Sequence, residues 1–139
     1  MIIENYLQVE NDIADRLTAE LPFANIYRQA AEDDTTTRTI STPAVWISYA
    51  GFKPGGSSSS QNLQKVSQLW QISAVVDRPD YIVVGGILFV QMVKALKDYK
   101  AESWYKKAVL VGDDRDLNRW DLDPQLAYIP AMFEIEIVI

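Results

Sequence analysis

The stretch QLWQISAVVDRPDYIVVGGILFVQMVKALKDY (residues 68–99) decides the fold, because the spacing of its apolar residues changes part-way along. Up to Val76 they recur at every second position, which is typical of a strand. The break Asp77-Arg78-Pro79-Asp80 ends this alternation. From Tyr81 the apolar residues recur at steps of three and four, which predicts a helix running to about Lys100, with Asp80 as its N-cap.

The predicted helix has more apolar surface than one sheet face can easily cover. The inner stripe that we expect against the sheet is Tyr81, Val84, Leu88, Met92, Ala95 and Tyr99. Further apolar residues in the first three turns are Val83, Ile87, Phe89, Val90 and Val93. Something else must therefore pack on this helix. Gly85 and Gly86 lower helix stability and predict either a late helix start, which we favour, or a close crossing over a strand.

A second strand precedes this stretch, at AVWISYAGF (residues 44–52). Its Val45 and Ile47 share one side, and Trp46 on the other side indicates a second buried surface. Between the two strands lies GFKPGGSSSSQ (residues 51–61), where we expect a flexible hairpin loop that projects beyond the sheet. It is not a phosphate-binding P-loop, because no G-K-[ST] follows the glycines, and the Rossmann glycine spacing is absent as well.

The rest of the chain completes an α+β pattern of order α-β-β-β-α-β-β. The other predicted elements are an amphipathic helix over 4–20 ended by Leu21-Pro22, a short strand over 24–29, an exposed connection over 31–42, a strand over 107–111, and a closing strand over 126–139. We expect one domain over residues 1–139, with a mainly antiparallel sheet, an extended hairpin and both helices packed on one face.

Composition excludes several function classes. The 139 residues contain no cysteine and no histidine, which removes disulfides, thiolate nucleophiles, zinc fingers and histidine-dependent triads. A net charge of −6 argues against nucleic-acid recognition. The start of the chain does not match a secretory signal, and the apolar run Tyr81–Val93 is shorter than the roughly 20 residues of a membrane span. We therefore expect a soluble, non-exported protein.

Two acidic patterns resemble functional sites and fail closer tests. Asp114, Asp116 and Asn118 match the start of a calcium-binding loop, but Arg119 stands where the loop needs glycine and Gln125 where it needs glutamate, so a solvated acidic loop is the better interpretation. A second pattern is the pair Glu134 and Glu136, which lie on one strand face and fit a polar outer stripe better than an acid–base pair. We therefore predict no enzymatic activity, catalytic residue, cofactor or metal.

The tryptophans are interpreted as packing residues. Trp46 and Trp70 lie on predicted strands and suit core or interface anchors. Trp104 and Trp120 stand beside charged residues, as at the rim of a subunit contact.

With these elements placed, the whole chain resembles the tail terminator and tail completion proteins of tailed phages and phage-like contractile particles. The segments that carry the resemblance are the N-terminal helix ending in LP (21–22), PAVWISYAG (43–51), the polar loop, QLWQISAVVDRPD (68–80), GGILFVQMVKALKDY (85–99) and AMFEIEIVI (131–139). Residues 70–99 match best: a strand with a tryptophan before alternating aliphatic residues leads through an arginine-containing break and a glycine pair into the second helix. The segment DDRDLNRWDLDP (113–124) departs from the family pattern.

The resemblance implies a structural protein that forms a six-membered ring on the head-proximal end of the tail tube and stops its polymerisation. Its implied partners are other copies of itself, the tail tube protein, and sheath, neck, connector or cap proteins. The implied location is the tail of a virion or phage-like contractile injection particle assembled in the host cytoplasm, with no membrane partner. A closed ring needs two different patches on each subunit. The residues that we expect at partner or subunit contacts are Trp46, Lys53, Gly55, Gly56, Ser57, Ser58, Phe89, Val90, Trp104, Arg119 and Trp120.

Two alternatives stay open at this point. One is another neck or minor tail component of similar fold. The other is a small-ligand-binding or enzymatic α+β domain with a carboxylate site.

Overall fold

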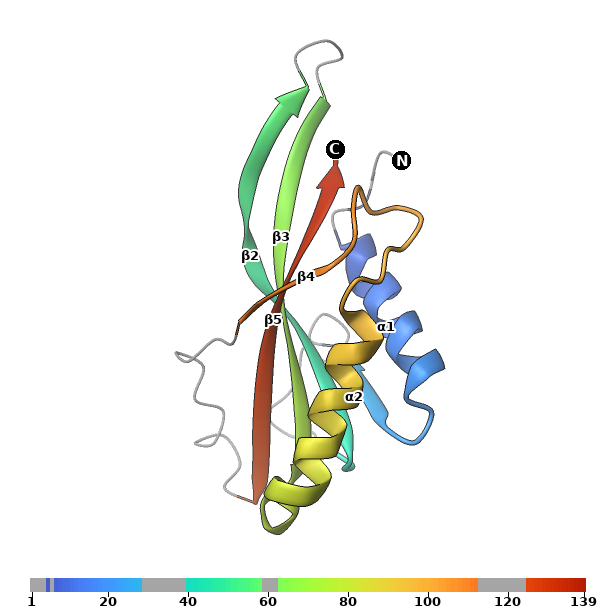
Figure 1. Cartoon of the computed structure of the whole chain (residues 1–139), viewed down its shortest axis with the longest axis vertical. Coiled ribbons are helices and arrows are strands. Elements are labelled where there is room, and N and C mark those ends of the chain that lie inside the picture. Colours follow the sequence, from blue (N-terminus) through green and yellow to red (C-terminus); the bar gives the residue numbers. More distant parts are fainter. Residues whose placement is uncertain (1–4, 6, 29–39, 59–62, 113–124) are drawn as a thin grey trace.

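The structure, a computed structural model, describes residues 5, 7–28, 40–58, 63–112 and 125–139 (Figure 1). Its helices and strands are α1 (Gln8–Glu20), β1 (Asn25–Arg28), β2 (Ala44–Ser58), β3 (Leu63–Asp77), α2 (Gly86–Leu96), β4 (Val109–Gly112) and β5 (Leu126–Val138). The predicted order of elements and the α+β class are confirmed.

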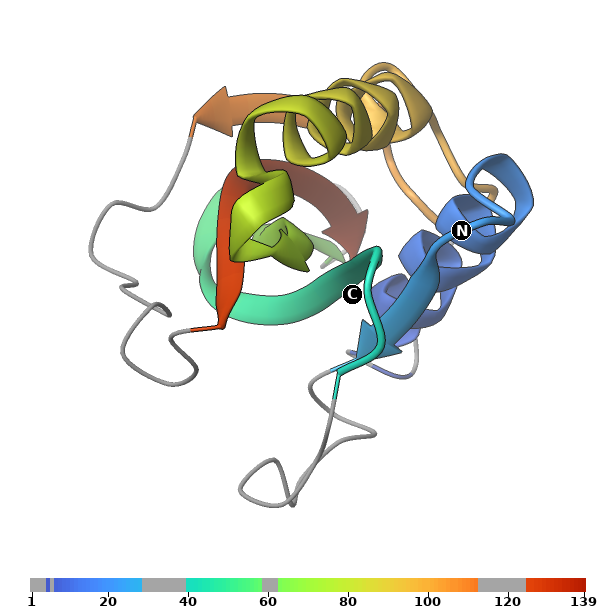
Figure 2. The ribbon, with the colours of Figure 1, turned by 90° about the horizontal axis from the view of Figure 1, so that it is seen from below.

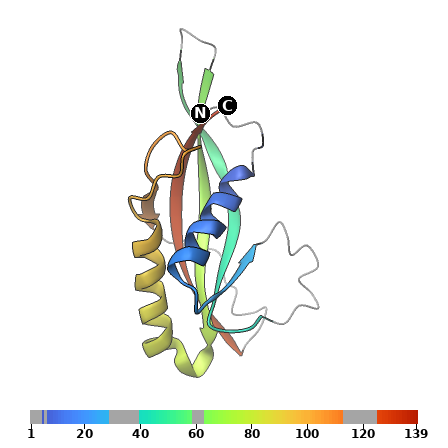
Figure 3. The same cartoon turned by 90° about the vertical axis from the view of Figure 1, so that its right-hand side faces the viewer.

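The five strands form one sheet in the order β1-β2-β3-β5-β4. β1 pairs with β2 in parallel, and the other neighbours pair antiparallel. The sheet curls strongly when seen along its strands (Figure 2). Both helices lie on the same face of it, side by side (Figure 3), as the sequence predicted.

The main core lies between this helical layer and the sheet. Alternation places Trp70, Ile72, Ala74 and Val76 of β3 on the helix side, and Trp70 is paired directly with Phe133 of β5. α1 adds Val9, Ile13 and Leu17, and α2 adds Leu88, Met92, Ala95 and Leu96. Regular alternation along β3 therefore gives one dry face, as period-2 patterning requires.

The second buried surface predicted from Trp46 is present on the other side of the sheet. Its buried residues are Ala44, Trp46, Val75, Leu126 and Tyr128. Tyr27 of β1 stacks on Trp46 with ring centroids 6.3 Å apart. Trp46 is only 5% exposed, so residues of this chain already cover it. The packing within the chain accounts for its position without a second subunit.

The approach to α2 differs from a simple helix. Arg78–Asp80 forms a 3₁₀ turn, and Tyr81–Gly85 forms a π-helical turn before α2 begins at Gly86. The late start is confirmed, and the close crossing occurs as well: a Cβ at Gly85 would lie 2.8 Å from Ile129 Cδ1 and 3.1 Å from Val76 Cγ2. The Asp80 side chain makes no capping hydrogen bond, so that part of the prediction was wrong.

The predicted inner stripe was correct within α2 and wrong for the residues before α2. Tyr81 and Val84, predicted to face the sheet, are exposed. The wider π turn changes the angle between successive side chains, so 3.6-residue spacing no longer describes residues 81–85. The helix also ends at Leu96 rather than near Lys100, and Asp98 adopts a left-handed φ of 64° soon after.

The glycine–serine stretch is more regular than predicted. β2 continues to Ser58, which pairs with Leu63, with irregularities between Tyr49 and Gly51 and between Pro54 and Ser57. Gly51 has φ 118°, a conformation that favours glycine. The prediction of a loop over residues 51–61 was therefore wrong as far as Ser58, because pairing with β3 keeps this segment extended.

Candidate association surface

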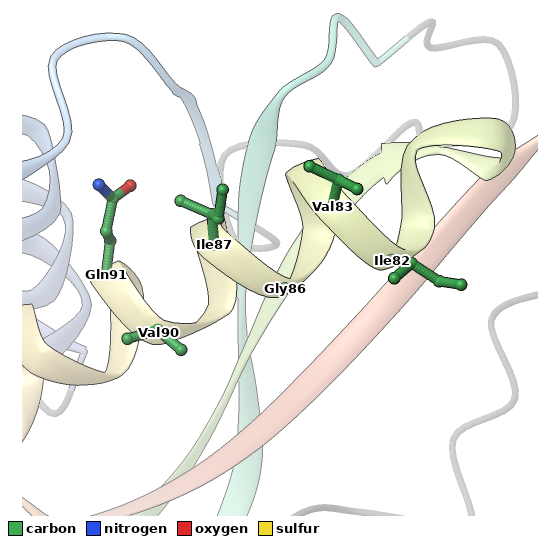
Figure 4. Close-up of a pocket in the computed structure, with 6 residues that line it drawn as sticks. All are labelled: Ile82, Val83, Gly86, Ile87, Val90 and Gln91. Atoms are coloured by element: carbon green, nitrogen blue, oxygen red, sulfur yellow. The ribbon is translucent and has the colours of Figure 1, made fainter.

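The clearest candidate for a functional surface is an apolar face on the turn and helix that follow β3. We call Ile82, Val83, Gly86, Ile87, Val90 and Gln91 the α2 outer face; they line a shallow hollow of about 430 Å³ (Figure 4). Ile82 is 82% exposed, Val83 67%, Ile87 56% and Val90 50%. A contiguous exposed apolar group of this kind often marks a binding surface.

Gly86 forms the floor of the hollow. In Figure 4 Gly86 lies between Ile82 and Val90 on one edge of the helix, and the side chains of Val83, Ile87 and Gln91 project from the other edge. A Cβ built at Gly86 would meet no atom of the described residues within 4 Å, and the backbone there is helical, with φ −62°. Packing within the described chain therefore gives no reason for glycine at this position, unlike at Gly85.

The helical stretch Arg78–Leu96 is 19 residues long and, by length and composition, apolar enough to cross a membrane. However, its second half carries Leu88, Met92, Ala95 and Leu96 into the protein core, and Lys94 lies within it. The core helix of a soluble protein meets the same criterion. Its apolar character is thus divided between the core and the α2 outer face.

A second apolar region adjoins the helix at the sheet edge. All four residues of β4 are exposed, and β4 is the last strand of the sheet on that side in the described chain. A cavity of about 500 Å³ separates this edge from α2; it is lined by Tyr81, Phe89, Leu110, Gly112, Tyr128, Ile129, Pro130 and Ala131. Of the two predicted contact residues on α2, Val90 belongs to the outer face and Phe89 lines this cavity and packs against the core.

Charge differs between the two helices. Lys94 and Lys97 follow the α2 outer face and are exposed. α1 carries four carboxylates and one arginine. Its Asp15 and Glu20 are exposed, and Glu20 forms an ion pair with Arg16 at 2.8 Å. The protein therefore has an apolar face continued by lysines on one helix and an acidic surface on the other.

Trp104, predicted at a subunit rim, is instead an internal anchor. It is buried, its indole N–H donates to Asp12 Oδ2 at 3.0 Å, and its ring meets Tyr99 edge-on with centroids 5.4 Å apart. Ser103 Oγ donates to the same Asp12 oxygen at 2.7 Å. These contacts fasten the segment after α2 to α1, and the sequence pattern gave no sign of them.

The remaining predicted contact residues lie away from the α2 outer face or outside the described residues. Lys53 is exposed on β2 and forms an ion pair with Glu134 at 3.3 Å. Gly55, Gly56, Ser57 and Ser58 lie in the far part of β2. Arg119 and Trp120 lie outside the described residues, as do Asp114, Asp116 and Asn118 of the calcium-like pattern.

The paired glutamates of β5 are held by lysines. Glu134 pairs with Lys53, and Glu136 pairs with Lys106 at 3.5 Å. Beside them, hydrogen bonding to Tyr105 raises the pKa of Lys65, whose Nζ lies 4.3 Å from the centre of that ring. In the part of the chain that the structure describes, no three Asp or Glu residues are grouped so as to hold a metal ion.

No protein-family model matches this chain, and no curated protein matches it either. The resemblance to tail terminator proteins thus rests on the order and character of the segments themselves.

Sequence reasoning found the excess of apolar residues on α2 but missed three members of the outer face, Ile82, Gly86 and Gln91. Ile82, the most exposed of them, stands one turn before Gly86 and two turns before Val90. This four-residue spacing was a readable signal. Gly86 was interpreted through helix propensity alone, whereas its surroundings make it the floor of a hollow.

Proposed function

We propose that this protein is a non-enzymatic structural subunit that assembles into a ring on the end of a tail tube, stops tube polymerisation and connects the tube to a neck or cap. The observation that carries this proposal is the α2 outer face, with four aliphatic side chains at least half exposed. The order of segments, which resembles that of tail terminator proteins, supports the same function.

Self-association gives these side chains a place out of water. Burying an aliphatic side chain stabilises a contact by about 1.5–3 kcal/mol when it was fully exposed before. Because the four side chains are half to four-fifths exposed, their burial contributes on the order of 5 kcal/mol per contact. A heterologous contact repeated around an axis closes into a ring if the rotation between neighbours permits.

The long β2–β3 hairpin supplies a natural arm for the tube or a neighbouring subunit. It extends beyond both helices at one end of the molecule (Figure 1). Its far part is held to the C-terminus by two backbone hydrogen bonds between Gln64 and Ile139, of 3.0 and 3.2 Å. A paired arm of this kind is pre-organised, which lowers the entropic cost of binding.

The test uses Ile87→Asp, with Phe52→Asp as a matched control, since the two side chains are 56% and 59% exposed. Native mass spectrometry would report the number of subunits, and electron microscopy would report the length of tubes grown with each protein. Phe52 lies on the β2–β3 arm, so Phe52→Asp is a control for ring formation alone. We expect rings with the unmodified chain and with Phe52→Asp, and monomers with Ile87→Asp. We expect short tubes with the unmodified chain and unregulated tubes with Ile87→Asp. A chain that stays monomeric at high concentration and leaves tube length unchanged would contradict the proposed function.

A further inference from the structure

The hollow at Gly86 has a shape and chemistry that call for an apolar side chain from outside the chain. Its rim is aliphatic apart from Gln91, and its floor lacks a Cβ. A glycine in such a position lets an inserted side chain approach the helix backbone closely. Because helix propensity disfavours glycine, the hollow costs the monomer stability that a contact can offset.

The described chain has a suitable side chain on a different side of the molecule. Phe23 lies in the turn between α1 and β1 and is 53% exposed. This turn is at the β1 edge of the sheet, whereas α2 packs over β3 and adjoins the β4 edge. Two different patches on different sides of one subunit are what a heterologous contact requires.

Charges beside the two patches are complementary. The α2 outer face continues into Lys94 and Lys97. Phe23 follows an α1 surface of net negative charge, which carries Asp15 and the ion pair between Glu20 and Arg16. Opposite charges in an interface favour the correct partner and discourage others. Pairing the α2 faces of two copies in parallel would instead bring lysines together.

On each of the two helical segments the charged residue and the apolar group lie at different heights along the molecule. Lys94 is eight residues after Gly86, about 12 Å along α2. Asp15 lies in α1, before the turn that holds Phe23. Figure 3 shows α1 and α2 running in opposite directions, with the turn after α1 and the start of α2 toward the same end of the molecule. A rotation about an axis along the long direction of the molecule would thus place Phe23 of one copy at Gly86 of the next. The same rotation would bring Asp15 of the first copy toward Lys94 of the second.

We propose that Phe23 of one copy inserts into the Gly86 hollow of a second copy, with the acidic side of α1 against Lys94 and Lys97. This contact rests on the proposed function, because it requires that the subunits form a ring. It names the two patches through which neighbouring subunits join.

Cross-linking tests the contact directly, because the chain has no cysteine of its own. Two single variants, Phe23→Cys and Ile87→Cys, are mixed and treated with a short bismaleimide. Phe52→Cys replaces Phe23→Cys in the control mixture, since Phe52 is similarly exposed at 59% but lies on the hairpin. We expect the Phe23→Cys mixture to give mixed dimers in severalfold higher yield than the control.

Other results overturn the contact. Efficient cross-linking of Ile87→Cys to itself would mean that two α2 faces pair about a two-fold axis. Rings by native mass without the mixed cross-link would reject this contact and leave the ring itself standing. A monomer that instead sediments with phosphatidylcholine vesicles would show that the face binds lipid, and both the contact and the ring would fail.

A second variant separates association from folding. Gly86→Ala fills the floor of the hollow where no described atom lies within 4 Å, so the monomer should fold. We expect it to weaken association by roughly tenfold, because one extra methyl group overpacks a fitted contact. Exchange of the charges tests the same register. We expect Asp15→Lys and Lys94→Asp each to weaken association, and the two changes combined to restore it. If the combined variant does not restore association, this register is wrong.

Discussion

A methyl group added at Gly85 would lie 2.8 Å from the Cδ1 atom of Ile129, because the turn before α2 crosses directly over β3 and β5. The next residue, Gly86, has free space at the same point. Two adjacent glycines thus have opposite environments, one facing the core and the other facing away from the protein.

We therefore expect Gly85→Ala and Gly86→Ala to differ in sign. Gly85→Ala should lower the free energy of unfolding by about 1–3 kcal/mol, since the methyl group overpacks against Ile129 and Val76. Gly86→Ala should raise it by up to about 1 kcal/mol through helix propensity. Urea unfolding of dilute, monomeric protein measures both. Equal effects of the two substitutions would mean that the crossing is looser than described.

A second prediction concerns a polar pair inside the main core. The Trp70 indole N–H donates to Gln68 Oε1 at 2.9 Å, and both residues are fully buried. Gln68→Leu should cost about 1–3 kcal/mol in the free energy of unfolding, because it leaves the indole N–H without this acceptor.

Trp70→Phe provides the control for this pair. In a protein that already carries Trp70→Phe, the further change Gln68→Leu should cost less, since the indole donor is gone. A double-mutant cycle on urea unfolding measures the difference as a coupling energy. A coupling near zero would show that the hydrogen bond does not contribute to stability.

The parts of the fold that the sequence predicted are those decided by local pattern. Alternation from Trp70 to Val76 predicted both the strand and its buried side, because a one-residue shift in register would turn every apolar side chain outward. Trp46, on the opposite side of its strand from Val45 and Ile47, correctly indicated the second buried surface.

The errors arose where distant segments decide the local structure. The Gly-Gly-Ser-Ser segment has low strand propensity, yet beyond the irregularity at Gly55 and Gly56 its two serines pair with β3. The end of β5 supports β3 there through Gln64 and Ile139. The π turn at Tyr81–Gly85 likewise accompanies the crossing over Ile129. For the candidate site, apolar excess was visible in Val83, Ile87 and Val90, but the hollow depends on which way Gly86 faces.

A third prediction concerns the attachment of the segment after α2. Asp12 Oδ2 accepts hydrogen bonds from Ser103 Oγ and Trp104 Nε1, and the Arg16 guanidinium lies 4.4 Å from the centre of the Tyr99 ring. Asp12→Ala removes both acceptor contacts and should lower the free energy of unfolding by about 1–3 kcal/mol. Asp12→Asn keeps an acceptor oxygen and should cost less. If alanine and asparagine cost the same, the contacts to Asp12 are not what hold this segment.

The last prediction concerns the β2–β3 arm. Replacing residues 55–65 by Asn-Gly keeps the Pro54↔Val66 pair and provides the residues that a two-residue hairpin turn needs. Because Val66 and the core below it remain, the monomer should still fold, with a modest loss from the missing contacts between Gln64 and Ile139. Replacing only residues 59–62 by Asn-Gly keeps the Ser58↔Leu63 pair and serves as the control. We expect the longer deletion to impair control of tube length in the assembly assay while native mass still reports rings, and the shorter one to act like the unmodified chain. If the variant with the longer deletion still controls tube length fully, the arm does not contact the tube, and the rest of the subunit makes that contact.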